Sequence, residues 1–224
     1  MAYNGRKIIF IGLFLASMIP LFGIAPAVAA NRYWVGITSP DNWNDPNNWS
    51  AISGGAGGIG VPGAGDTAIF DGGNTNSCQI DISSTVASAI MYSTYTATVS
   101  INSGMSLSTS GSFKIAGGTF NTNGQLLEVG SYNQTGGVFN AGASAITCNG
   151  NFSTTGGTFN AGSSTLILDA TNGSGTFTGG GYIFNNVIFQ SVSAVGRTWT
   201  LGGGNMTFNG NFQVKAGGSG NLTV

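Results

Sequence analysis

The chain has 224 residues, of which 39 are Gly, and only 6% carry a charge, compared with roughly 25% in an average soluble domain. Six Lys and Arg stand against seven Asp and Glu, which gives a net charge of −1, and His is absent. An apolar content of 41% argues against a disordered chain, the lack of a basic patch argues against nucleic-acid binding, and the absence of His excludes Ser-His-Asp triads and His-ligated zinc.

Residues 1–30 have the pattern of a signal peptide. Arg6 and Lys7 form a short basic segment, residues 8–22 are an uncharged and mostly apolar run, and residues 27–30 are a small-residue cleavage site. A retained membrane anchor is the alternative, because the stretch is just long enough to span a bilayer. We expect cleavage, and therefore a secreted or cell-surface protein with no membrane segment after processing.

Residues 31–75 are rich in Trp, Asn, Pro and Gly, and we expect them to form a cap over the open end of the fold. Their indoles either plug that end or stack on sugar rings; the three candidates are Trp34, Trp43 and Trp49. Their carboxylates either stabilise turns or bind Ca²⁺, the only cofactor that the sequence suggests; the four candidates are Asp41, Asp45, Asp66 and Asp71. The loop after Asp71 lacks the spacing of an EF-hand.

Residues 76–224 contain an internal repeat that decides the predicted fold. Three similar segments begin at Gly111, Gly130 and Gly150, so the period is 19 and then 20 residues, and each segment contains a Gly pair followed by an aromatic residue and Asn. A period of this length suits one coil of a solenoid. We predict an all-β fold, a right-handed parallel β-helix (β-solenoid) of about seven coils with a Trp-rich amino-terminal cap. A barrel or sandwich would explain the strands but not the period.

Stacked coils place equivalent residues about 4.8 Å apart, so the repeat predicts ladders of like side chains. The two inward aromatic ladders are Phe113, Tyr132 and Phe152, and Phe120, Phe139 and Phe159. An amide ladder at a turn consists of Asn121, Asn140 and Asn160. Inward aliphatic rows are Leu127, Ile146 and Leu166, and Val129, Cys148 and Leu168. The Gly pairs at 117–118, 136–137 and 156–157 are expected between strands, where Gly turns a corner with positive φ.

Two cysteines in an exported protein suggest a disulfide, but their positions argue against one. Cys78 and Cys148 both fall on inward positions, and 70 residues, or about 3.5 coils, separate them. Disulfides need Cα atoms within about 7 Å. We therefore predict two buried free thiols.

The opening motifs Tyr33-Trp34-Val35-Gly36 and Asn48-Trp49-Ser50, together with Gly65-Asp66-Thr67, resemble the start of large secreted microbial surface proteins of the right-handed β-helix type. The segment from Trp49 to the strand at Asp81 is similar to the G8 domain, a Gly-rich all-β module. The resemblance covers nearly all of the chain after the signal peptide. It implies a β-helix displayed at a surface and implies no catalytic site.

The expected function is that of a non-enzymatic cell-surface or extracellular-matrix protein, an adhesive or structural stalk. Outside residues 31–75 the only acids are Asp81, Glu128 and Asp169, and the sequence predicts no carboxylate pair for glycoside hydrolysis. The alternatives are a carbohydrate-binding or carbohydrate-active β-helix protein and a subunit of an extracellular filament. Expected partners are glycans, neighbouring surface proteins, or a second copy joined at the open carboxy-terminal coil. We also expect the native chain to continue past Val224, because the last coil lacks a cap.

Overall fold

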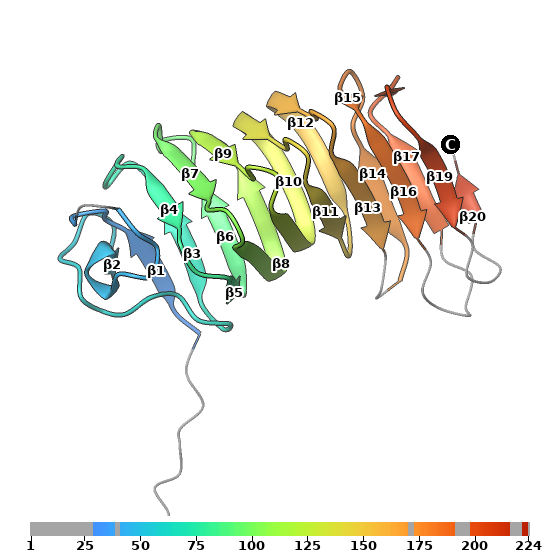
Figure 1. Cartoon of the computed structure of the whole chain (residues 1–224). Coiled ribbons are helices and arrows are strands. Elements are labelled where there is room, and N and C mark those ends of the chain that lie inside the picture. The colour runs from blue at the N-terminus through green and yellow to red at the C-terminus, as the bar shows by residue number, and fades with distance from the viewer. Residues whose placement is uncertain (1–28, 39–40, 170–172, 191–197, 216–220, 224) are drawn as a thin grey trace, which may run out of the picture.

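The computed structural model describes residues 29–38, 41–169, 173–190, 198–215 and 221–223. The predicted signal peptide, apart from its last two residues, and Val224 lie outside the described residues. The regular secondary structure is nearly all strand: 53% of the residues are in strands and 2% in helices. The chain winds into a β-solenoid of about seven coils. Figure 1 shows the coils following one another along a rod, with β1 at one end and β20 at the other. The predicted fold class is confirmed.

Each coil contributes strands to three faces, and strands on one face pair in parallel with those of the neighbouring coils. The first face contains β3 (Thr67–Phe70), β6 (Ser88–Met91), the end of β8 (Ser106–Ile115), the middle of β10 (Leu126–Asn140), the start of β12 (Phe152–Asn160), β14 (Gly175–Thr178), β17 (Thr198–Gly202) and β20 (Asn221–Thr223). The second face contains β5 (Ser84–Val86), the starts of β8 and β10, β11 (Ala145–Cys148), β13 (Thr165–Asp169), β16 (Asn186–Gln190) and β19 (Phe212–Lys215). The third face contains β4 (Cys78–Ile80), β7 (Thr98–Ile101), β9 (Thr119–Asn121), the ends of β10 and β12, β15 (Ile183–Phe184) and β18 (Thr207–Phe208).

The amino-terminal segment ends the parallel stack. Strand β1 (Asn31–Trp34) pairs in parallel with β3, whereas β2 (Trp49–Ser50), which follows the short 3₁₀ helix η1 (Pro46–Asn48), pairs with β1 in the antiparallel sense. Strand β3 lies within the predicted cap region yet already forms a rung of the first face. The parallel hydrogen bonding of the coils therefore extends into the cap and stops where β2 reverses direction.

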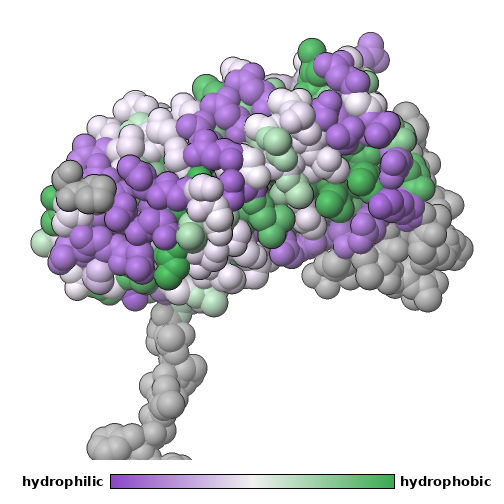
Figure 2. All heavy atoms as spheres, in the orientation of Figure 1, coloured by the Kyte–Doolittle hydropathy of each residue, from purple (hydrophilic) through white to green (hydrophobic). Residues whose placement is uncertain are grey.

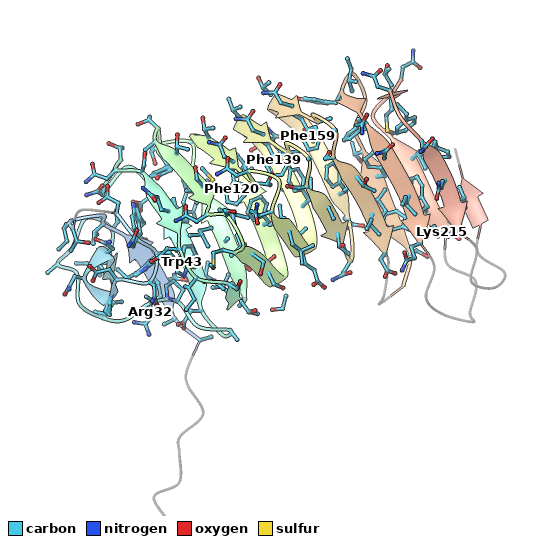
Figure 3. All side chains as sticks on the ribbon, viewed as in Figure 1. Arg32, Trp43, Phe120, Phe139, Phe159 and Lys215 are labelled. Atoms are coloured by element: carbon cyan, nitrogen blue, oxygen red, sulfur yellow. The ribbon has the colours of Figure 1, made fainter. Side chains whose placement is uncertain are left out.

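The predicted aromatic ladders are confirmed by the strand register. Tyr132 pairs with Phe113 on one side and Phe152 on the other, and its ring stacks on Phe152 with centroids 4.3 Å apart. Phe139 lies between Phe120 and Phe159, with centroids 5.9 and 5.2 Å away. Figure 3 shows these three labelled rings in successive coils. Edge-to-face contacts between the two ladders join them into one core.

The amide ladder is also confirmed. Nδ2 of Asn140 donates to Oδ1 of Asn121, and Nδ2 of Asn160 donates to Oδ1 of Asn140, both at 2.7 Å. Asn121 extends the row by donating to Oγ of Ser100 at 3.4 Å. Each coil therefore gains one side-chain hydrogen bond to the next at the end of its third-face strand.

The Gly pairs turn corners as expected; the pair at 117–118 lies between β8 and β9, whereas the other two pairs lie within strands. The second Gly of each pair has a positive φ, of 63° at Gly118, 60° at Gly137 and 79° at Gly157. Strands β10 and β12 nevertheless run through their pairs, with shifts of register beside Thr135. The expected interruption is wrong for these two coils, in which the strand continues and the pairing resumes at Val138 and Thr158 after the shift.

The predicted aliphatic rows and thiols are confirmed. Val129 pairs with Cys148, and Cys148 pairs with Leu168; the second row, of Leu127, Ile146 and Leu166, lies beside them. Cys78 belongs to another column, in register with Val99. Both cysteines are buried and free.

Candidate functional site

The three cap indoles are buried rather than displayed. Trp34, Trp43 and Trp49 are 0, 1 and 0% exposed, and they pack edge to face on each other and against Phe70. Nε1 of Trp34 donates to the carbonyl of Asn76 at 3.0 Å, and Nε1 of Trp49 donates to that of Trp43 at 2.8 Å. Figure 3 shows Trp43 at the amino-terminal end of the core. No ring face is accessible to a sugar, so the sugar-stacking interpretation is corrected in favour of end closure.

Asp66 holds the amino terminus of the described chain against the first coil. Its carboxylate accepts hydrogen bonds from the backbone amides of Ala30 at 2.9 Å and Gly63 at 3.0 Å, and it pairs with Nε of Arg32 at 3.3 Å. Burial pushes the pKa of Asp66 upward, but the two amides and the Arg32 guanidinium outweigh that effect, so the pKa is lowered. This carboxylate is a structural anchor.

The other candidate Ca²⁺ ligands lie in separate turns. Asp45 accepts from the Asn47 amide and caps η1, while Asp71 accepts from the Gly73 amide. Asp41 is partly buried, which raises its pKa. Within the described part of the chain, no three Asp, Glu, Cys or His side chains stand close enough to hold a metal ion. The structure does not bring the four together.

A polar groove of about 600 Å³ runs along the corner between the second and first faces. It crosses five neighbouring coils, from β5 to the segment before β14. Its lining side chains carry hydroxyl, amide or carboxylate groups, or are absent at Gly; the set comprises Thr85, Ser108, Thr109, Ser110, Glu128, Gly130, Ser131, Asn149, Gly150, Asn151, Gly173 and Ser174.

The leading Gly of each repeat lets neighbouring coils approach closely at this corner. A Cβ at Gly150 would stand 2.6 Å from the carbonyl oxygen of Gly130, and one at Gly111 would stand 2.8 Å from that of Ala87. Real Cβ atoms do not approach a backbone oxygen so closely, so a side chain at Gly111 or Gly150 would force these neighbouring coils to shift. Polar residues on either side of this close backbone contact line the groove.

Hydrogen bonds between coils order the groove walls. Nδ2 of Asn149 donates to Oε1 of Glu128 at 3.0 Å, and Glu128 is the one charged residue among the lining residues that the structure describes. Oδ1 of Asn151 accepts from the amide of Thr176 at 3.0 Å, and the Ser131 hydroxyl lies 3.3 Å from that of Ser112. These side chains are therefore positioned before any ligand arrives.

Glu128 aligns with Thr147 and Ile167 at an outward strand position of the repeat, but the sequence does not indicate a groove there. The available signal was the recurrence of Ser, Thr or Asn at outward positions beside each leading Gly. On the first face this column comprises Thr67, Ser88, Ser112, Ser131, Asn151, Thr176 and Thr200.

Comparison with protein-family models, with curated proteins and with solved structures gives no match for this chain. In the described residues, no helix is long and apolar enough to cross a membrane.

Proposed function

We propose that this chain is a non-enzymatic, exported surface or extracellular-matrix protein that acts as an adhesive or structural stalk. The observation that carries the proposal is the unbroken stacking of parallel coils, in which backbone hydrogen bonds, the aromatic ladders and the amide ladder all run along one axis. Such a rod resists bending because every coil is bonded to both neighbours. Such stiffness suits a rigid spacer between a cell and the surface to which the cell adheres.

The composition of the exterior supports contact with polar polymers. Charged residues are 6% of the chain, so hydroxyl, amide and backbone groups dominate the solvent-facing positions. On the face drawn in Figure 2, hydrophilic and neutral residues cover most of the surface, and apolar residues gather toward the carboxy-terminal coils. There the exposed large apolar side chains include Ile183, Phe212 and Val214.

Carbohydrate binding is a second candidate function, and the polar groove favours it. Its hydroxyl and amide groups both donate and accept hydrogen bonds, as sugar hydroxyls do. The two functions are compatible, because an adhesive stalk needs a ligand on its surface.

Labelling of intact producing cells with an antibody tests the proposed function. We expect label on unpermeabilised cells or in the surrounding matrix, and no release of reducing ends when the purified chain is incubated with cell-wall polysaccharides. Label that appears only after permeabilisation, or steady release of reducing ends, would overturn the proposal.

A further inference from the structure

We propose that the groove between the second and first faces binds one extended strand of a neutral polysaccharide, laid parallel to the solenoid axis. This inference rests on the proposed function and names the ligand class of its surface. The observation that carries the proposal is a hollow that crosses five coils and presents polar groups, several of them held by hydrogen bonds between coils.

The dimensions of the groove suit a linear polymer rather than a compact molecule. Five coils at a spacing of about 4.8 Å extend about 19 Å from the first to the fifth. Each coil adds polar or Gly residues to the lining, although not at one equivalent position, so polar groups recur along the groove at about the strand spacing. A pyranose unit in an extended chain is about as long as that spacing, and successive sugars therefore meet successive coils.

The chemistry of the walls selects hydroxyl groups. Ser108 and Ser131 offer hydroxyls that donate and accept, and Asn151 offers an amide group that does both. Glu128 only accepts, and a carboxylate has about four acceptor positions, so Asn149 leaves it capacity for sugar hydroxyls. Hydrogen bonds to an ionised acceptor are stronger than those between neutral groups.

The charge of the groove excludes acidic polymers. Glu128 supplies one negative charge, and the residues described as its lining include no Lys or Arg. A chain of uronic acids or sulfated sugars would bring like charge against Glu128 with no compensating cation. The groove therefore discriminates between polymers by charge, and the lining residues within the described part of the chain include no aromatic ring that would stack on a sugar.

Titration of the full chain with oligosaccharides tests this inference. The probes are cellohexaose, xylohexaose, mannohexaose and chitohexaose, the corresponding disaccharides, and polygalacturonate as the acidic control. We expect at least one neutral hexasaccharide to bind with a Kd of about 1 mM or tighter, a disaccharide to bind at least about tenfold more weakly, and polygalacturonate not to bind.

Two groove variants and one matched control localise the binding. Ser108→Trp fills the hollow and should weaken binding by at least about tenfold, whereas Thr158→Trp adds the same ring to an exposed position of β12 outside the groove and should leave binding unchanged. Glu128→Lys changes an exposed residue, so it remains informative if Ser108→Trp does not fold, and it should also weaken binding.

Two groups of results overturn the inference. The first is the failure of every neutral hexasaccharide to bind, or stronger binding of polygalacturonate. The second is unchanged hexasaccharide binding in Glu128→Lys and in folded Ser108→Trp. Either result leaves the proposed surface function standing if intact cells are still labelled, whereas loss of surface labelling refutes that function whatever the titrations show.

Discussion

Replacement of Phe139 by Ala tests whether the aromatic ladder holds the coils together. Phe139 is 0% exposed, and its ring lies 5.9 Å from Phe120, 5.2 Å from Phe159 and 5.4 Å from Tyr132, measured between centroids. Truncation of a buried Phe costs about 3–5 kcal/mol, the sum of lost transfer free energy and the cavity left behind. The upper part of that range is expected here, because strand pairing on both sides prevents the neighbouring rings from closing the gap.

The measurement is urea denaturation followed by far-ultraviolet circular dichroism, with the free energy of unfolding compared at an unchanged m-value. Lys114→Ala serves as the control, because Lys114 points outward between Phe113 and Ile115. Its substitution should lower the free energy of unfolding by under ~0.5 kcal/mol. Equal losses in the two variants would refute the assignment of inward and outward residues. A loss below ~1 kcal/mol for Phe139→Ala would show that the ladder contributes little.

Three further substitutions or treatments probe the corner, the cap and the thiols. Gly137→Ala should cost about 1–3 kcal/mol in the same denaturation assay, because φ is 60° and the new Cβ would stand 2.7 Å from the Gly117 carbonyl oxygen. The lowered pKa of Asp66 means that the unfolded chain binds a proton more readily than the folded one, so the stability that this carboxylate contributes is lost as the pH falls below about 4. Thermal melts of Asp66→Asn should therefore show a smaller loss of stability in acid than those of the parent protein. An identical loss in both proteins would contradict the ion pair. Burial raises the pKa of Cys148 to about 11 and that of Cys78 well above its usual range. Iodoacetamide at pH 8 should therefore label neither thiol in the native protein, and should label both after denaturation without reductant. Mass spectrometry measures the labelling.

The sequence alone determines the coil and its contents. The recurrence of Gly, an aromatic residue, a Gly pair and Phe-Asn at a period of 19–20 residues is enough to predict the two aromatic ladders and the amide ladder, because parallel stacking puts like positions one strand spacing apart. Alternation along each strand then predicts which residues point inward. The free thiols follow from the same register.

The tertiary structure alone decides what the surface offers. Whether Trp43 and Trp49 are exposed depends on the antiparallel return of β2 onto β1, a pairing between short segments with no repeat to reveal it. The groove lies at the corner between two faces, where the coils approach closely at Gly130 and Gly150. The sequence repeat specifies which residues occupy equivalent positions on one face of successive coils. A groove, however, arises from the path of the backbone between two faces, and the repeat does not specify that path.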